Sequence, residues 1–232
     1  MILALNTSTR QCSIALLNMD RTVIAEQLMF EGKGHFSGLM PAIDELINGF
    51  GLNHKDIKGV AVATGPGSFT GLRVGLSLAK GFCHALQVPV FGISSLKALA
   101  FQLPLTPHPI APLLSSRRGE VFTALFLWNR ENGLERKEKD NCFKLEAIPS
   151  LFTDNTVFVG NDFLTQGARL KELIGNHTRI APPQCWQLRA SSIGALALIR
   201  FEAGDLDDPN NLVPRYFRPP DIRPQPAFPA DK

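Results

Sequence analysis

The sequence predicts an α/β protein whose two halves repeat one α/β unit. Each half opens with two apolar, strand-like segments joined by a short turn, and each continues into amphipathic helical segments. The stretch at 103–112 holds four prolines in ten residues and separates the halves. We therefore expect a first unit at 1–104, a second unit at 105–213 and a proline-rich tail at 214–232, with a ligand cleft between the units.

The first half is expected to begin with three antiparallel strands, at 1–7, 12–19 and 22–30. A helix follows, because large apolar residues then recur at three- and four-residue steps. Its expected N-cap is Ser37, and Pro41 falls in its first turn, where the missing N–H costs little. The repeating apolar residues are Phe36, Leu39, Met40, Ile43, Leu46, Ile47 and Phe50.

The remaining chain alternates strands and helices. Two further strands, at 59–65 and 88–93, are each followed by a helix. The last helix, 191–204, begins with serines and ends at a glycine, and we expect it to pack back on the first unit. The other elements expected in the second half are strands at 110–116, 120–129, 156–162 and 178–182 and a helix at 163–174.

Composition narrows the functional classes. No apolar run reaches the roughly 18 residues that span a bilayer, and the first residues turn polar too early for a signal peptide. Four scattered cysteines without a C-x-x-C pair are typical of reduced thiols, which favours the cytoplasm. Five isolated histidines and no H-E-x-x-H motif predict no metal site, and the net charge of +3 is too small to identify a nucleic-acid partner.

The most informative segment reads ATGPGSFTG and joins an apolar strand to a helix. One interpretation is a weak anion site, in which Gly65 and Gly67 expose backbone amides and Ser68, Thr70 and Arg73 add polar groups. The alternative is a helix start, with the glycines making the turn and Ser68 or Thr70 as the N-cap. The spacing G-x-G-x-x-x-G matches neither the dinucleotide motif nor a P-loop, which favours the helix start.

The helix after this loop carries only one narrow polar stripe. The rest of its circumference is apolar or small, whereas an ordinary surface helix is apolar over roughly a third of its surface. Such a helix needs cover on two sides, by its own sheet and by a second helix from this chain or from another protein. The predicted partner-binding face comprises Phe36, Leu39, Met40, Ile43 and Ile47 of the first helix and Gly71, Val74, Gly75, Leu78 and Phe82 of the second.

Few residues qualify as catalytic. A phosphate-handling cleft would need an acid after the first strand or in the second hairpin, and the chain has Asn6 and Ser115 there. Neither side chain is charged, so neither holds magnesium strongly or acts as a general base. We expect no catalytic residue and no cofactor of its own, which favours an interaction protein over an enzyme.

The segment GPGSFTGLRVGLSLAKG closely resembles the signature of the TsaB (YeaZ) family. Further segments resemble that family in the same order along essentially the whole chain: ILALNTST as the opening strand, GHFSGLMPAIDEL as a helix, RRGEVF as a hairpin and LVPRYFRPP near the end. Proteins of this family take part in forming the threonylcarbamoyl group on adenosine 37 of tRNAs that read ANN codons.

The resemblance implies an actin-like ATPase (ASKHA) fold of two related lobes, each with a mixed sheet and flanking helices. It implies a noncatalytic subunit that pairs through its two apolar helices with a TsaD-like catalytic subunit, or with a second copy of itself when alone. A TsaE-like ATPase joins that complex, and this chain contacts tRNA only indirectly, through the complex. A nucleotide can bind at the interface with the catalytic partner.

Two positions depart from the family pattern. Asn6 stands where the family usually has an acid, and Ser115–Ser116 replaces an Asp-Ala pair. The absence of acidic side chains at these two positions argues against the main alternative function, a small actin-fold kinase or transferase acting in the cleft between the lobes. A third alternative is direct tRNA binding by Arg215, Arg218 and Arg223. The competing interpretation is that these arginines belong to an ordinary solvated tail.

Overall fold

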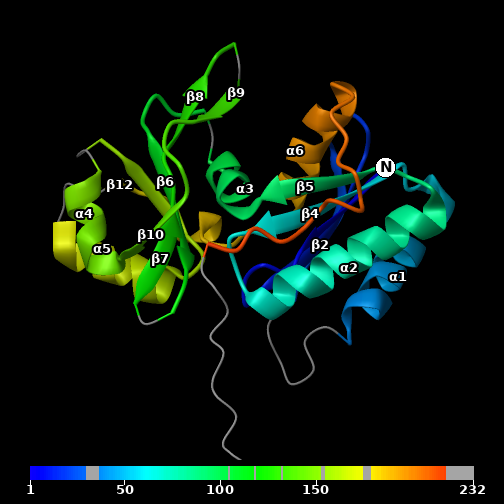
Figure 1. Ribbon diagram of the computed structural model, residues 1–232, viewed down its shortest axis with the longest axis horizontal. Coiled ribbons are helices and arrows are strands. Elements are labelled where there is room, and N and C mark those ends of the chain that lie inside the picture. The colour runs from blue at the N-terminus through cyan, green and yellow to red at the C-terminus, as the bar shows by residue number, and fades with distance from the viewer. Residues whose placement is uncertain are drawn as a thin grey trace, which may run out of the picture.

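The computed structural model describes residues 1–29, 37–103, 105–117, 119–131, 133–152, 155–174 and 179–217. Two β-sheets lie side by side, and helices flank each of them (Figure 1). We call the first sheet with its helices the first lobe and the second sheet with its helices the second lobe. The C-terminal segment, residues 207–217, runs from the first lobe toward the second (Figure 1).

The first sheet has the strand order β3-β2-β1-β4-β5. The β1–β2 and β2–β3 pairs are antiparallel, whereas the β1–β4 and β4–β5 pairs are parallel. Its central strands are wholly buried because helices cover both faces. The strands are β1 (Ile2–Asn6), β2 (Cys12–Leu17), β3 (Val23–Met29), β4 (Gly59–Gly65) and β5 (Val90–Ser94).

Two helices cover each face of this sheet. The α1 helix (Leu39–Gly49) and the α2 helix (Phe69–Leu86) share a core with Leu3 and Leu5 of β1. The α3 helix (Ser95–Phe101) and the α6 helix (Ala190–Glu202) share the other core with Ile2 and Ala4. Successive side chains of a strand point to opposite faces, so β1 contributes to both cores.

The second sheet repeats this plan in the order β10-β7-β6-β11-β12. Its β6–β7 and β7–β10 pairs are antiparallel and its β6–β11 and β11–β12 pairs are parallel, as in the first sheet. The duplicated unit predicted from the sequence is thereby confirmed. The strands are β6 (Ile110–Ser115), β7 (Glu120–Thr123), β8 (Phe126–Asn129), β9 (Gly133–Arg136), β10 (Asn141–Lys144), β11 (Val157–Gly160) and β12 (Arg179–Ile180).

Helices of the second lobe occupy corresponding places. The α4 helix (Ile148–Leu151) lies between β10 and β11, as α1 lies between β3 and β4. A π-helical turn (Phe163–Gly167) and the α5 helix (Ala168–Ile174) follow β11, as α2 follows β4. The ends of β1 and β4 therefore correspond to the ends of β6 and β11, and the two sets of strand ends meet between the lobes.

Local differences from the predicted elements have physical reasons. The N-cap of α1 is Gly38, without a side-chain cap, so the prediction of Ser37 as the cap is wrong, while Pro41 does lie in the first turn. The strand predicted at 120–129 is split at 124–125, since β7 pairs with one end of β6 and β8 with the other.

Phe36, which was predicted to belong to the partner-binding face, falls outside the described residues.

The α6 helix packs on the first lobe, against β1 and β2. Its N-cap is Arg189 rather than a serine, because Ser191 has another partner. The Ser191 hydroxyl and backbone N–H both donate to the Glu26 carboxylate of β3, at 2.9 and 3.0 Å. Arg189 donates to the same carboxylate at 2.7 and 2.9 Å, so one buried acid ties α6 to the edge of the first sheet.

We predict that Glu26→Ala lowers the free energy of unfolding by about 2–3 kcal/mol, because it removes a buried carboxylate and leaves the partly buried donors of Arg189 and Ser191 without their acceptor. Urea denaturation measures this change. The matched control is Glu202→Ala, which removes an exposed ion pair with Arg21 and is expected to cost less than about 1 kcal/mol. Equal costs for the two variants would contradict the anchoring role of Glu26.

Candidate functional site

Two features of the molecule are candidate functional sites: the outward surface of α1 and α2, and the cleft between the lobes. The predicted partner-binding residues divide into two groups by burial. Leu39, Ile43, Ile47 and Phe82 are buried in the chain's own core against the first sheet. Met40 is 42% exposed, and Val74 and Leu78 are half-buried, so among the predicted residues that the structure describes only these three reach the surface.

The two glycines predicted to admit a partner helix instead admit part of this chain. A Cβ atom on Gly71 would lie 1.9 Å from the Thr7 carbonyl oxygen, and one on Gly75 would lie 2.2 Å from the Thr7 hydroxyl. The Thr7 hydroxyl also donates to the Gly71 carbonyl at 2.7 Å. Gly71 and Gly75 are therefore already covered by Thr7 in the loop after β1, and the prediction that they face a partner is wrong.

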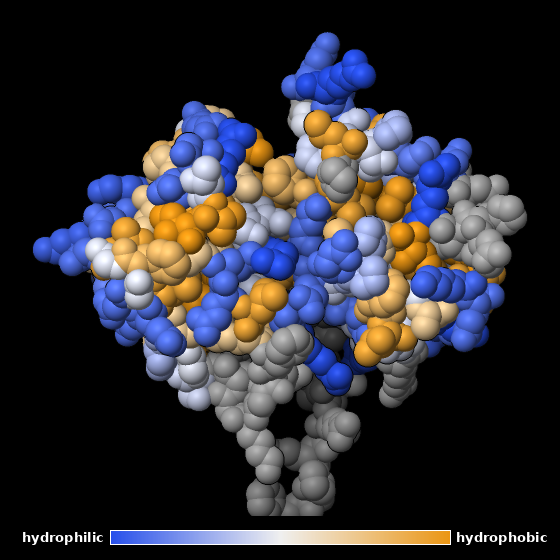
Figure 2. All heavy atoms as spheres, turned by 180° about the vertical axis from the view of Figure 1, so that it is seen from behind, coloured by the Kyte–Doolittle hydropathy of each residue, from blue (hydrophilic) through white to orange (hydrophobic). Residues whose placement is uncertain are grey.

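Some apolar surface remains outside this core. Phe50, at the end of α1, is 55% exposed and joins Met40, Val74 and Leu78 as large apolar side chains that the monomer leaves wholly or partly uncovered. We call these four residues the outward strip. Elsewhere, seen from behind, hydrophilic side chains gather along the middle of the molecule between the lobes (Figure 2).

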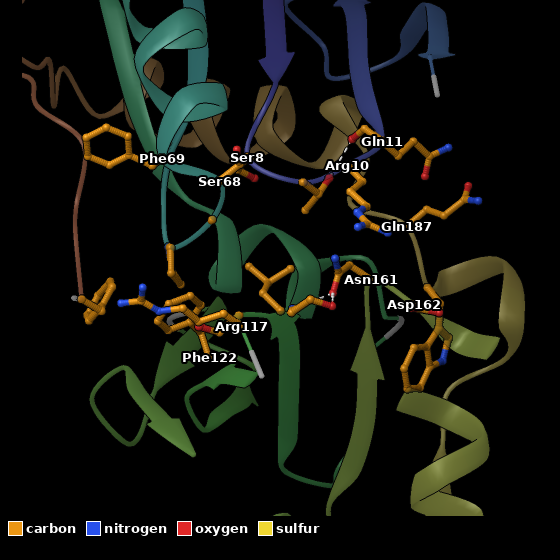
Figure 3. Close-up of a pocket in the computed structure, with 18 of the residues that line it drawn as sticks. Ser8, Arg10, Gln11, Ser68, Phe69, Arg117, Phe122, Asn161, Asp162 and Gln187 are labelled. Carbon is orange, nitrogen blue, oxygen red and sulfur yellow. Dashed lines mark hydrogen bonds between the residues drawn. The ribbon is translucent and has the colours of Figure 1, made fainter. Parts of the chain in front are cut away.

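A cleft of about 1220 Å³ lies between the lobes (Figure 3). Its walls come from the loops after β1 and β4 in the first lobe, from the ends of β6 and β11 in the second, and from the C-terminal segment. The lining residues are Ser8, Thr9, Arg10, Gln11, Pro66, Gly67, Ser68, Phe69, Leu114, Ser115, Ser116, Arg117, Phe122, Asn161, Asp162, Phe163, Leu164, Pro183, Trp186, Gln187, Arg215, Tyr216 and Phe217.

Asn6 is fully buried beneath the cleft wall, and its side chain forms hydrogen bonds to the loop after β1. Its carbonyl oxygen accepts from the backbone N–H and the hydroxyl of Ser8, at 3.0 and 2.7 Å. Its amide donates to the Leu188 carbonyl at 3.0 Å, which joins β1 to the segment before α6. An aspartate could accept from Ser8 but could not donate to Leu188, so the amide is suited to a structural role.

Ser115, at the corresponding end of β6, is also held by neighbours. Its backbone N–H and its hydroxyl both donate to the Asn161 side-chain oxygen, at 2.8 and 3.1 Å. Gln166, which is buried, donates to the Ser115 hydroxyl at 3.0 Å. No sequence pattern predicts this Ser115–Asn161–Gln166 network, because its members are brought together only by the parallel pairing of β6 and β11.

The glycine loop is closed by the loop after β1. The Ser68 N–H donates to the Ser8 carbonyl at 2.7 Å, and a Cβ atom on Gly67 would lie 2.2 Å from that oxygen. The Ser68 hydroxyl accepts from the Gly71 N–H at 3.2 Å, so Ser68 is the N-cap of α2. Of the two residues predicted as this cap, Ser68 is confirmed and Thr70 is not. Gly65, at a φ of +117°, makes the turn itself.

Arg73 points away from this loop and toward the C-terminal segment. Its Nε donates to the Tyr216 hydroxyl at 2.9 Å, and its guanidinium lies over the Phe69 ring at 3.9 Å. The Phe69 and Tyr216 rings are 4.9 Å apart. The glycine loop therefore works mainly as a helix start, and its first turn is joined to the end of the chain by an aromatic and cationic cluster.

No acidic centre is assembled in the described cleft. Asp162 is the one carboxylate among the described lining residues, and it accepts from the Thr165 N–H as a helix cap. Within the described ranges, no three His, Cys, Asp or Glu side chains come together to hold a metal ion. In the same part of the chain, no helix is long and apolar enough to cross a membrane.

Comparisons with known proteins give this arrangement a family. The model of the TsaD family, described as tRNA N6-adenosine threonylcarbamoyltransferase, matches residues 30–182. The tRNA threonylcarbamoyladenosine biosynthesis protein TsaB of Bacillus subtilis is 33% identical over 221 residues, which cover 94% of this chain and 93% of that protein. TsaB of Escherichia coli is 34% identical over 153 residues, covering 63% of this chain and 64% of that protein.

Solved structures agree on the fold. YeaZ from Pseudomonas aeruginosa superimposes with a TM-score of 0.76 at 22% identity, covering 93% of this chain and 99% of that one. The activator of 2-hydroxyisocaproyl-CoA dehydratase from Clostridium difficile, solved with bound ADPNP, superimposes with a TM-score of 0.52 at 12% identity, covering 87% and 94%.

The fold is thus that of the actin-like ATPase type, with two related α/β lobes. Within that class the chain belongs to the TsaB family, and its role lies in tRNA threonylcarbamoyladenosine biosynthesis. The expected fold and family are both confirmed.

The contact between Thr7 and α2 yields a stability prediction. Gly75→Ala forces a Cβ atom against the Thr7 hydroxyl and is expected to lower the free energy of unfolding by about 1–3 kcal/mol. Gly81→Ala, on the exposed side of the same helix with nothing within 4 Å, is expected to raise it by about 0.5–1 kcal/mol. Thermal unfolding of both variants tests this, and a gain in stability at Gly75 would contradict it.

Proposed function

We propose that this chain is a noncatalytic subunit that binds and stabilises a TsaD-like catalytic subunit, with a TsaE-like ATPase joining the complex. The complex would transfer the threonylcarbamoyl group to adenosine 37 of tRNAs that read ANN codons. Alone, the chain would form a homodimer through the same helices. Any nucleotide would bind at the interface with the catalytic partner rather than on this chain's residues alone.

The noncatalytic role rests on the polar groups at the strand ends of the cleft. Hydrolysis of a nucleotide in such a cleft needs carboxylates that hold magnesium and orient water. Asn6 and Ser115 occupy the two corresponding strand ends, and both are committed to hydrogen bonds within the chain. The noncatalytic role is supported above all by this observation: both side chains are uncharged and form hydrogen bonds within the chain.

The docking role rests on the outward strip. Met40 and Phe50 on α1 and Val74 and Leu78 on α2 form apolar surface on helices whose inner sides are anchored in the first core. A rigid pair of helices loses little conformational entropy on binding, which favours a specific interface. Packing against two helices of a partner would bury about 800 Å² on each side, the size of a standard interface.

We predict that the double variant Met40→Glu/Leu78→Glu abolishes co-purification with the TsaD-like subunit while the monomer stays folded. Met40 is 42% exposed and Leu78 is half-buried beside the first core, so each flexible glutamate can turn its carboxylate to water in the free chain, whereas the complex would desolvate both charges. Leu105→Glu, on a side chain 77% exposed in the second lobe, is the control and leaves co-purification intact. Retention of the partner by the double variant would remove the outward strip from the interface.

The competing enzyme hypothesis is tested by ATP turnover. We expect the purified chain alone to show no magnesium-dependent ATP hydrolysis above the buffer rate, because Asn6 and Ser115, at the ends of β1 and β6, supply no carboxylate and Asp162, after β11, caps a helical turn. The assay uses the full chain with and without excess EDTA. Turnover that depends on magnesium and is lost when Ser115 and Asn161 are replaced by alanine would establish the enzyme instead.

A further inference from the structure

We propose that the C-terminal segment, residues 207–217, is a clamp that holds the two lobes together across the cleft. The segment runs from the first lobe toward the second (Figure 1). Its last two described residues are aromatic and contact opposite lobes: Tyr216 packs on Phe69 of the first lobe and Phe217 on Phe122 of the second. We call Tyr216 and Phe217 the ring clamp. Release of Phe217 from the second lobe would let the cleft widen.

Tyr216 is held on the first lobe by packing and by a hydrogen bond. The centroid of its ring lies 4.9 Å from that of Phe69, at the start of α2. Its hydroxyl accepts from Arg73 Nε at 2.9 Å, and the Arg73 guanidinium lies over the Phe69 ring at 3.9 Å. These three side chains join the end of the described chain to the first turns of α2.

Phe217 contacts the second lobe through packing alone. The centroid of its ring lies 6.1 Å from that of Phe122, within the roughly 4.5–7 Å that separates paired aromatic rings. Phe122 is 8% exposed and belongs to β7, which pairs with a strand on each side, so it offers a rigid contact surface. Phe217 is 39% exposed, and its side chain has no polar group to form a hydrogen bond. The contact with the second lobe is therefore the weaker of the two.

The two contacts lie on opposite walls of one cleft. Figure 3 shows Phe69 on the wall of the first lobe and Phe122 across from it on the wall of the second. Adjacent residues have Cα atoms about 3.8 Å apart, so a dipeptide that contacts both walls limits how far they can separate. Arg215, Tyr216 and Phe217 all line the cleft, and movement of the ring clamp therefore changes the cleft itself.

The segment before the ring clamp is firmly attached to the first lobe. The Arg215 N–H donates to the Thr64 carbonyl of β4 at 2.8 Å, and the Asp207 carboxylate accepts from the Gly92 N–H of β5 at 2.7 Å. Regions with few buried contacts open locally at the lowest free energy. We therefore expect Phe217 to leave the second lobe while this attached root stays in place.

The lobes also share a core, which confines their relative movement. The α3 helix packs against β4 and β5 of the first sheet and against β6 and β11 of the second. Its buried Leu96 and Leu99 belong to one hydrophobic cluster with Ile93 of β5 and Leu113 of β6. Because this core keeps the lobes attached, release of the ring clamp changes the width of the cleft without separating the lobes.

The attached root includes one of the three arginines suggested from the sequence for tRNA contact. Arg215 lines the cleft, whereas Arg218 and Arg223 lie outside the described residues. Direct contact of these arginines with tRNA stays a prediction.

Distances between spin labels on the two lobes test the clamp. The labels replace Ser77 of α2 and Lys144 of β10, both exposed, through a ketone-bearing amino acid, because the chain has four cysteines. Double electron–electron resonance on the otherwise unaltered full chain should show mainly one short-distance population. For Phe217→Ala we expect a longer-distance population to grow about fivefold relative to the short-distance one, the effect of losing one aromatic pair.

A second substitution separates a clamp from independent stabilising contacts. Adding Tyr216→Ala to Phe217→Ala should leave the distance distribution unchanged, because without Phe217 the ring clamp no longer reaches the second lobe. Contacts that stabilise the closed form independently would instead add their effects. Tyr216→Ala alone should give a smaller shift than Phe217→Ala, since the Arg215 hydrogen bond still holds the root.

The matched control is Val213→Ala, in the same segment, at a side chain that is 61% exposed. Its distance distribution should equal that of the unaltered chain. An unchanged distribution in Phe217→Ala, an equal shift in Val213→Ala, or a further shift on adding Tyr216→Ala would each overturn the proposal. Urea denaturation checks that every variant is folded. Should Phe217→Ala fail to fold, Phe217→Leu replaces it: a smaller shift in the same direction is then expected, and no shift overturns the proposal.

Discussion

Thr7 and Ser8 lie directly against three glycines of the loop and helix that follow β4, and much of the molecule depends on this contact. Their carbonyl oxygens occupy the space that side chains at Gly67 and Gly71 would fill. The contact sets α2 against the end of β1, closes one wall of the cleft and turns Val74 and Leu78 toward solvent. A larger residue at any of these glycines would move the helix and both candidate sites together.

The strand ends at the cleft are held by hydrogen bonds within the chain. In the duplicated unit the ends of β1 and β6 approach the cleft from opposite lobes. Asn6 uses its amide to hold the loop after β1 to the segment before α6, and Ser115 joins the ends of β6 and β11. Both positions stabilise the scaffold with uncharged hydrogen bonds.

Much of the fold could be predicted from sequence, because strong apolar periodicity and punctuation by glycine and proline are local signals. The strands of the first half, the helices α1, α2 and α6, and the duplication were predicted in this way. The split between β7 and β8 was not, since the two strands pair with opposite ends of β6, which lies elsewhere in the chain. The family itself followed from the signature around Gly65 to Gly71.

The sequence by itself determined the residue types at each site: uncharged groups at Asn6 and Ser115, an apolar pair of helices and a capped glycine loop. Only the tertiary structure decided which of those residues remain available. Leu39, Ile43, Ile47 and Phe82 are buried in the core of the chain. Gly71 and Gly75 pack closely against Thr7. Contacts between distant segments, such as Arg73 with Tyr216, depend on how the whole chain folds back, and no local pattern encodes them.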